Sequence, residues 1–385
     1  MAITLLVTDQ DLAPVGDVID GWTSLDVTRR FNEPASGTVE LPASPEVAEI
    51  LAEGHRLVVM RDGQVWCAGP MEVPQEWEVG WGESGQAPPG TITVHFSDDL
   101  ARIAGYITWP DPAVAWSSQP AGAWRTITGQ TGEQIIRQLI TENCGPAARP
   151  ERQIPALALG AVAGVGTTTS VNTRFEPLLE ACRRVAIDAG GLGFRTRQSG
   201  GQILFEVYAP RDLTGTARFS FGLGNLRHLR AKVSAPTVTH ALVAGTELEF
   251  DRAFVQVADT AAASRWYRVE RFIDGSAETD DDGELTQAGK EALAEGAAPV
   301  ELATVTVDTP DLRAGRDFDL GDRVSIVLPS GAEVADLVRS IHLQASPTGG
   351  EYVTSLVGSA EATSDPAMVR LVRDLTRRVG RIVAR

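Results

Sequence analysis

Apolar and polar residues alternate over short runs along most of this chain, and turn residues separate one run from the next. The alternation is clear over 22–31 and 37–41. Two further runs, 56–61 and 64–68, flank Asp62-Gly63, a dipeptide typical of tight hairpins. A period of two residues is the pattern of half-buried strands. With 38 Gly and 22 Pro spread through the sequence, the chain is expected to form many short strands rather than a helical bundle.

A chain of 385 residues is too long for one ordinary core, so two or three domains are expected. The strand pattern of residues 1–125 predicts a first β-barrel-like domain, and residues 203–235 are expected to complete it. The β pattern returns after residue 217, and seven short strands, interrupted by a helix near 286–295, indicate a second β-barrel-like domain over 236–358. The predicted fold class is mostly β with an α+β insert and a C-terminal helix.

The insert is a small α+β domain over 126–210. Its two expected helices, near 131–140 and 175–188, each carry an apolar stripe at helical spacing. The stripes consist of Ile135, Ile136, Leu139 and Ile140, and of Leu178, Leu179, Cys182 and Val185. Strands are expected from Phe194 and over 202–208.

Residues 107–125 form a linker between these domains that carries three tryptophans. Trp109, Trp116 and Trp124 lie among Pro, Ser and Ala, and are expected to act as anchors. They pack either on their own domain or on a neighbouring subunit, and the sequence favours neither.

The last segment, 359–385, is interpreted as a linker followed by a coiled-coil helix. Its apolar residues follow the 4, 3, 4, 3 spacing of a coiled-coil seam, which consists of Met368, Val372, Leu375, Val379 and Ile382. A lone helix of this length is marginal in water. The favoured role is self-association or attachment to the next protein along an axis, and the alternative is a helix folded back on the body.

The formal charge of −17 argues against a surface that binds duplex DNA, because phosphate contact needs basic patches. An acidic wall would let DNA pass without binding, and the simpler explanation of the charge is solubility. Cys67, Cys144 and Cys182 are widely spaced, which fits assembly in a reducing cytoplasm. No signal peptide or membrane span is expected.

Motifs for catalysis and cofactor binding are missing. The glycine-rich stretch 160–166 lacks the lysine of a phosphate-binding loop, and the five histidines are far apart. The acidic run 274–284 resembles half of a calcium loop, but Gly289 stands where a bidentate Glu is needed. We therefore expect no catalytic, cofactor-binding or metal-ligating residues, no cofactor and no enzymatic activity.

Several motifs, taken in order, resemble the tail-tip baseplate hub proteins of long-tailed phages (siphophages). They lie at 22–41, 205–214, 219–226, 235–245, 266–274 and 318–322, the last reading Phe-Asp-Leu-Gly-Asp. The resemblance spans about residues 3 to 358. Leu320-Gly-Asp322 is expected to open a barrel strand, with the glycine allowing a bulge or turn.

The resemblance implies a structural homotrimer at the distal end of the tail tube, assembled in the bacterial cytoplasm and carried in the virion. Its partners would be the distal tail protein ring, the tape measure protein and spike or fibre proteins, with DNA passing through without specific binding. Many such hubs continue into a lysin or fibre-binding region. This chain stops at Arg385, so any wall-degrading activity is expected in another protein.

Two alternative functions belong to other classes. One is a cell-wall hydrolase that uses dispersed carboxylates, and the other is a carbohydrate-binding module with Trp109, Trp116 and Trp124 as its platform. The missing motifs weigh against the first, and the expected interfacial helix weighs against the second.

Overall fold

The computed structural model describes residues 3–19, 21–71, 76–78, 90–120, 122–233, 235–245, 252–274, 282–296 and 300–358. The chain divides into two compact units. The first comprises Met1–His228 and Thr304–Arg385, and the second comprises Leu229–Ala303. The expected coiled-coil segment, 359–385, lies outside the described residues.

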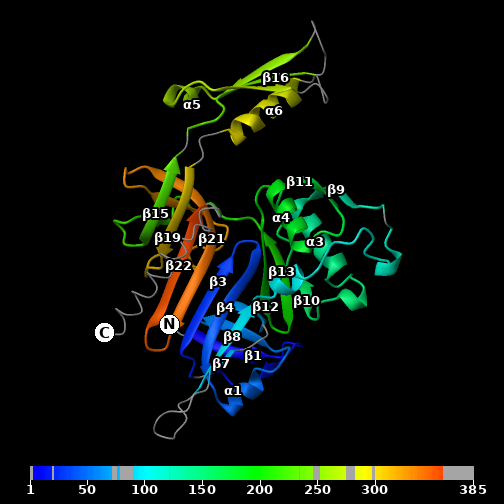
Figure 1. The fold of residues 1–385 in the computed structure, drawn as a ribbon, viewed down its shortest axis with the longest axis vertical. Coiled ribbons are helices and arrows are strands. Elements are labelled where there is room, and N and C mark those ends of the chain that lie inside the picture. The colour runs from blue at the N-terminus through cyan, green and yellow to red at the C-terminus, as the bar shows by residue number, and fades with distance from the viewer. Residues whose placement is uncertain are drawn as a thin grey trace. The chain divides into compact units, whose positions relative to one another are not determined.

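A mixed sheet of ten strands lies mostly in the first unit (Figure 1). Its main path runs β15 (Leu226–Val233), β19 (Val300–Val307), β22 (Gly350–Gly358), β21 (Glu333–Ser346), β3 (Ser24–Arg30), β4 (Glu33–Pro42), β8 (Thr91–Ser97) and β7 (Glu76–Glu78). Two more strands, β14 (Arg218–Phe219) and β20 (Arg323–Val327), attach to this path through β21. The antiparallel pairing of β3 with β21 places Val27 opposite Leu343 in the core, and both are buried.

A smaller antiparallel sheet has the order β2-β1-β5-β6 and comprises β1 (Ile3–Thr8), β2 (Pro14–Val15), β5 (Arg56–Arg61) and β6 (Gln64–Pro70). The hairpin predicted at Asp62-Gly63 is confirmed. Asp62 and Gly63 have φ values of 52° and 77°, as a tight primed turn requires. Two short helices, α1 (Pro45–Ile50) and α2 (Leu100–Ala104), also belong to this part of the unit.

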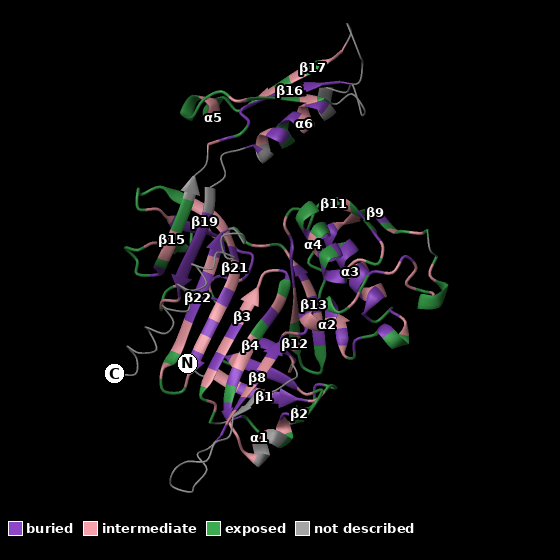
Figure 2. Cartoon of the chain, viewed as in Figure 1, coloured by how far each residue is buried: buried purple, intermediate pink, exposed green. Residues whose placement is uncertain are grey.

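The predicted α+β insert contains α3 (Gly132–Asn143), α4 (Leu178–Asp188), β9 (Arg125–Thr131), β10 (Leu157–Leu159), β11 (Thr168–Thr173), β12 (Gly193–Ser199) and β13 (Gln202–Tyr208). Thr131 and Gln134 form a capping box that fixes the start of α3. Both predicted helical stripes are confirmed, because all eight of their residues are buried in one core (Figure 2). Short 3-10 turns occur at Trp116–Ser118 and Pro150–Arg152.

The second unit has a three-stranded sheet of order β17-β16-β18. It contains β16 (His240–Ala244), β17 (Phe254–Ala258), β18 (Glu270–Asp274), α5 (Thr260–Arg265) and α6 (Asp282–Glu295). Helix α6 covers one face of this sheet, where Ala241 and Ala292 share a small core. Gly289 allows the close approach, because a Cβ there would lie 2.5 Å from Val257 Cγ2.

The mostly β class is confirmed, but the strands group differently from the expected boundaries. Strands expected together in a barrel over 236–358 divide between the three-stranded sheet and the ten-stranded sheet. Strand β21 pairs with β3, so residues from 1–125 and 236–358 share one sheet. The described strands form open sheets rather than closed barrels. The reason is that pairing between distant strands depends on long-range packing, which local alternation does not encode.

Candidate functional site

The motifs at 205–214 and 318–322, more than 100 positions apart, meet beside the insert. The Tyr208 hydroxyl, at the end of β13, donates to the Leu320 carbonyl at 3.0 Å. The Asp322 carboxylate is buried and accepts from the Arg211 backbone N–H at 2.9 Å and from the Arg211 guanidinium. It also accepts from the Asp319 N–H at 2.8 Å. These contacts form a latch between the insert and the ten-stranded sheet.

The strand expected after Leu320-Gly-Asp322 is present, but it belongs to an open sheet rather than to a barrel. Strand β20 begins at Arg323, directly after this tripeptide. Gly321 has a φ of 83°, and a Cβ there would lie 2.3 Å from Phe31 Cε2. Glycine is therefore required at this turn both by the backbone conformation and by the space available.

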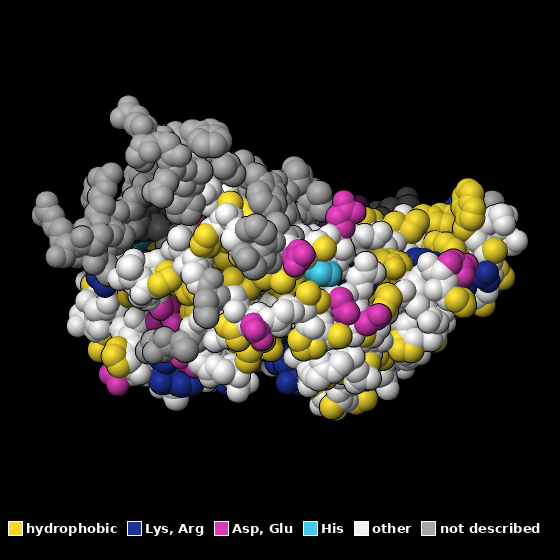
Figure 3. All heavy atoms as spheres, turned by 90° about the horizontal axis from the view of Figure 1, so that it is seen from below, with side chains coloured by type: hydrophobic (Ala, Val, Ile, Leu, Met, Phe, Trp, Pro, Cys, Tyr) yellow, Lys and Arg dark blue, Asp and Glu magenta, His cyan; other side chains and the backbone are white. Residues whose placement is uncertain are grey.

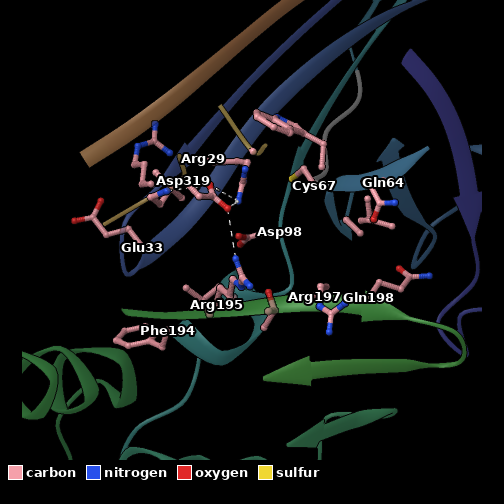
Figure 4. A pocket seen from close by; sticks show the side chains of 18 of the residues that line it. Arg29, Glu33, Gln64, Cys67, Asp98, Phe194, Arg195, Arg197, Gln198 and Asp319 are labelled. Atoms are coloured by element: carbon pink, nitrogen blue, oxygen red, sulfur yellow. Dashed lines mark hydrogen bonds and ion pairs between the residues drawn. The ribbon is translucent and has the colours of Figure 1, made fainter. Parts of the chain in front are cut away.

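Asp319 lies between two arginines from different parts of the unit. Arg29 of β3 contacts its Oδ1 at 3.2 Å, and Arg195 of β12 contacts its Oδ2 at 3.4 Å (Figure 4). Burial by itself would raise the pKa of Asp319, but the Arg29 charge, the Leu320 N–H and the Arg195 charge outweigh it and lower the pKa. The carboxylate therefore stays ionised and holds both arginines in place.

A polar cavity of about 290 Å³ opens beside this cluster (Figure 4). Four arginines and three acidic residues line it: Arg29, Arg30, Arg195, Arg197, Glu33, Asp98 and Asp319. Three buried atoms that line it have no hydrogen-bond partner within the described part of the chain, namely Trp66 Nε1, Asp98 Oδ1 and Thr196 Oγ1. Polar atoms of this kind bind water in folded proteins, and the cavity is large enough to hold several molecules.

Burial raises the pKa values of several groups in the cavity, among them Asp98 and Cys67. Burial, together with the neighbouring charge of Asp99, raises the pKa of Asp98 to about 6. Burial also raises the pKa of the Cys67 thiol well above its ordinary value. Cys67 is therefore a neutral thiol at physiological pH, and a neutral thiol is a poor nucleophile.

Further buried arginines join the four-stranded and the ten-stranded sheets of the first unit. Arg61 donates to the Ala314 carbonyl at 2.7 Å and contacts Asp308 at 2.8 Å. Trp66 lies near two guanidinium groups, with the Arg29 Cζ 4.6 Å and the Arg61 Cζ 4.8 Å from its ring centroid. These contacts combine ion pairing with cation–π attraction, which stabilises the junction.

The remaining sequence-predicted residues are spread over the chain. Trp109 is half-buried against its own insert, whereas Trp116 and Trp124 are exposed. Within the described ranges, no group of three or more His, Cys, Asp or Glu side chains is placed to hold a metal ion. Among the described residues, no helix combines the length and the apolar character needed to cross a membrane. The seam residues Met368, Val372, Leu375, Val379 and Ile382 lie outside the described residues.

The motifs at 205–214 and 318–322 contain the latch residues, but the ion pairs from Arg29 and Arg195 to Asp319 were not predicted. The sequence shows only the order of the two motifs, and order alone does not indicate that the segments containing Tyr208 and Asp322 lie side by side. Arg29 and Asp319 are 290 positions apart, so no local spacing connects them.

The chain matches a family model described as Siphovirus ReqiPepy6 Gp37-like protein over residues 4–359. The chain belongs to this family. The expected resemblance to siphophage tail proteins is thereby confirmed. No curated protein matches the chain.

Solved structures of tail proteins share the fold of this Gp37-like protein. The 43 kDa tail protein of prophage MuSo2 from Shewanella oneidensis has a TM-score of 0.52 at 13% identity, covering 92% of this chain and 97% of that one. A tail protein from Neisseria meningitidis MC58 has a TM-score of 0.53 at 14% identity, with 94% and 97% covered. Prophage tail protein gp18 from Listeria monocytogenes EGD-e has a TM-score of 0.53 at 10% identity, with 96% and 99% covered. At these identities the likeness establishes a phage tail-protein fold.

Loss of the latch hydrogen bond in a Tyr208→Phe variant is expected to lower the free energy of unfolding by about 1 kcal/mol. The Leu320 carbonyl loses its donor, while the ring keeps its packing. Urea denaturation of both proteins measures the difference. Tyr267→Phe, which removes a hydroxyl from an exposed tyrosine of the second unit, is the matched control. Equal stabilities of Tyr208→Phe and the native chain would contradict the role of this bond.

Proposed function

We propose that this Gp37-like protein is the structural baseplate hub of a long-tailed phage. Three copies form a ring at the distal end of the tail. The ring joins the tail tube and the distal tail protein ring to the spike or fibre proteins, contacts the tape measure protein, and lines the path by which DNA leaves. The protein is assembled in the host cytoplasm and carried in the virion.

The observation that carries this proposal is the family match over residues 4–359, together with the tail-protein fold. The buried arginine network supports a role as a structural connector, because it fastens the insert to the four-stranded and the ten-stranded sheets. Arg56 of β5, for example, donates to Thr8 of β1 at 3.1 Å and to Gln198 of β12 at 3.0 Å. A junction held by several buried contacts is rigid, as a connector between rings needs to be.

The charge of the chain supports a DNA path without specific binding. The net charge of −17 repels a polyanion. On the face drawn in Figure 3, basic side chains lie singly or in small groups among acidic and hydrophobic ones. Specific duplex recognition uses clustered basic residues instead.

The second unit offers a surface for partner proteins. The sheet face opposite α6 presents Leu242, Phe254 and Phe272, all of them exposed. Leu242 and Phe272 are register partners on neighbouring strands. Exposed apolar patches of this kind commonly mark protein–protein contacts.

If three copies form a ring, the full chain is expected to have the mass of a trimer in solution. A chain ending at Ser359 is expected to have a lower assembly mass, closer to that of a monomer. The seam formed by Met368, Val372, Leu375, Val379 and Ile382 supplies the self-association, because apolar residues at this spacing pack between helices. Light scattering measures the absolute mass of both chains.

Charged residues in the seam provide a sharper version of this test. A double variant, Leu375→Asp with Val379→Asp, is expected to dissociate as the truncated chain does, whereas Arg377→Ala outside the seam is expected to leave the mass unchanged. The proposed trimer would be overturned if the full chain remained monomeric at high concentration, both alone and in the presence of a ring of distal tail proteins.

A further inference from the structure

Arg152 is a buried cation without an acidic partner. Its side chain is 8% exposed, and no carboxylate pairs with it within the described part of the chain. Its Nη2 donates to the Ile107 carbonyl at 2.6 Å, while its Nη1 is buried and has no hydrogen-bond partner among the described residues. Charged groups are rarely buried unless they are paired. An unpaired guanidinium therefore marks a place where an anion would be stabilised.

The same arginine lines a hollow with aromatic walls in the insert. The cavity has a volume of about 760 Å³ and is lined by Gly105, Tyr106, Ile107, Trp109, Trp116, Gln119, Arg152, Arg174 and Phe175. Trp116 is 79% exposed and Phe175 is 42% exposed, so their rings are open to a ligand. The Arg152 guanidinium stacks 3.9 Å from the Trp109 ring centroid. A volume of this size is typical of small-molecule sites.

The lining of the hollow contains basic residues and no acidic ones, although the protein as a whole is acidic. The two basic residues are Arg152 and Arg174, and the whole chain carries a net charge of −17. Arg174 lies 5.8 Å from the Trp124 ring centroid and 5.7 Å from that of Phe175, which extends the aromatic and cationic surface beyond the hollow. The charge of Arg152 favours an anionic ligand over a neutral one.

The wall that carries Trp116 is held in a fixed shape. The Gln119 side chain donates to the carbonyls of Asp111 and Val114 at 2.7 and 3.1 Å and accepts from the Asp111 N–H at 3.1 Å. The Trp109 N–H donates to Asn143 Oδ1 of α3 at 3.0 Å. A preformed site of this kind loses little conformational entropy when it binds a ligand.

We infer that this hollow binds an acidic saccharide, meaning a sugar ring that carries a carboxylate or phosphate group. The apolar face of a pyranose ring stacks on an exposed aromatic ring such as Trp116, which uses the same aromatic surface that drives other stacking contacts. A carboxylate or phosphate is the group that a buried guanidinium binds best. This inference goes beyond the hub proposal and does not depend on whether three copies of the chain form a ring.

A single-stranded nucleic acid also combines rings with negative charge, but it fits the hollow less well. Proteins that bind single strands follow the backbone with an extended basic groove. Two arginines at one hollow cannot provide such a track in a chain of this charge. The observations therefore favour one or two acidic sugar units.

Isothermal titration calorimetry of the full chain tests this inference with four probes. They are trigalacturonate, mannose 6-phosphate, neutral maltotriose and a thymidine trinucleotide. Binding of trigalacturonate or mannose 6-phosphate, at least tenfold tighter than binding of maltotriose, is expected, and the preferred probe identifies the anion. Binding of neither acidic sugar, equal binding of maltotriose, or tighter binding of the trinucleotide would overturn the inference.

Variants locate the binding to the hollow. Trp116→Ala is expected to weaken binding of the acidic sugar by about tenfold through lost stacking. Because Trp116 is exposed, this change leaves the core intact. Arg152→Gln is expected to abolish the preference for the acidic sugar. Trp266→Ala, which removes an exposed tryptophan of the second unit, is the matched control. Unchanged binding in Trp116→Ala would overturn the assignment of the site.

Discussion

Replacing Asp99 by alanine is expected to lower the free energy of unfolding by about 3–5 kcal/mol. Asp99 pairs with Arg56, whose Nε lies 3.3 Å from Asp99 Oδ1, and the two side chains are 3% and 2% exposed. Removal of the carboxylate leaves a buried guanidinium without its counter-ion. The hydrogen bonds from Arg56 to Thr8 and Gln198 remain but do not neutralise its charge. Urea denaturation of the native chain and the variant measures the loss.

A double variant separates the cost of an unpaired charge from the net contribution of the pair. Arg56→Met with Asp99→Leu replaces the pair by apolar side chains, and it is expected to recover most of the stability that Asp99→Ala loses. The reason is that desolvation of two ions offsets much of their attraction. A loss below about 1 kcal/mol in Asp99→Ala would contradict the burial of this pair.

The parts of the fold that follow from local signals were predictable. The Asp62-Gly63 hairpin depends on two residues that both adopt positive φ. Helices α3 and α4 follow from apolar stripes within about three turns, and Ile135 and Leu139 are accordingly fully buried. Each of these signals lies within about a dozen residues, so sequence spacing contains the whole pattern.

The parts that depend on distant residues were not predictable from spacing. His342 of β21 contacts Asp26 of β3 at 2.7 Å across 316 positions, and nothing near either residue indicates the partner. The same holds for Arg29 and Asp319, because any of 51 acidic residues was available to each arginine. The unpaired Arg152 was equally invisible, since the absence of a counter-ion is a property of three-dimensional packing.

The latch explains why two short motifs, each of low specificity, occur together in this chain. In sequence, 205–214 and 318–322 were two short stretches in a matching order. In the structure, Tyr208 and Arg211 contact Leu320 and Asp322 directly. The residues on which the resemblance was based therefore include those that join the insert to the ten-stranded sheet.

An Asp98→Asn variant is expected to be more stable than the native chain above pH 6, by up to about 2–3 kcal/mol. Burial raises the pKa of Asp98 to about 6 in the folded chain, whereas an unfolded aspartate has a pKa of about 3.9. The folded state therefore binds more protons than the unfolded state between these values. Stability consequently falls as the pH rises from about 4 to 6, and the loss is complete above pH 6.

Asparagine is neutral at every pH, so the variant lacks this loss. The difference in unfolding free energy between Asp98→Asn and the native chain should be smallest near pH 4 and grow to its full value by about pH 7. Urea denaturation at several pH values measures it, and Asp311→Asn, at an exposed position, is the matched control. A difference that is independent of pH, or that grows towards acid, would contradict the shifted pKa. The expected result would mean that the ionised Asp98 carboxylate in the cavity lowers the stability of the folded chain. A residue that destabilises the fold in this way is a candidate for a functional rather than a structural role.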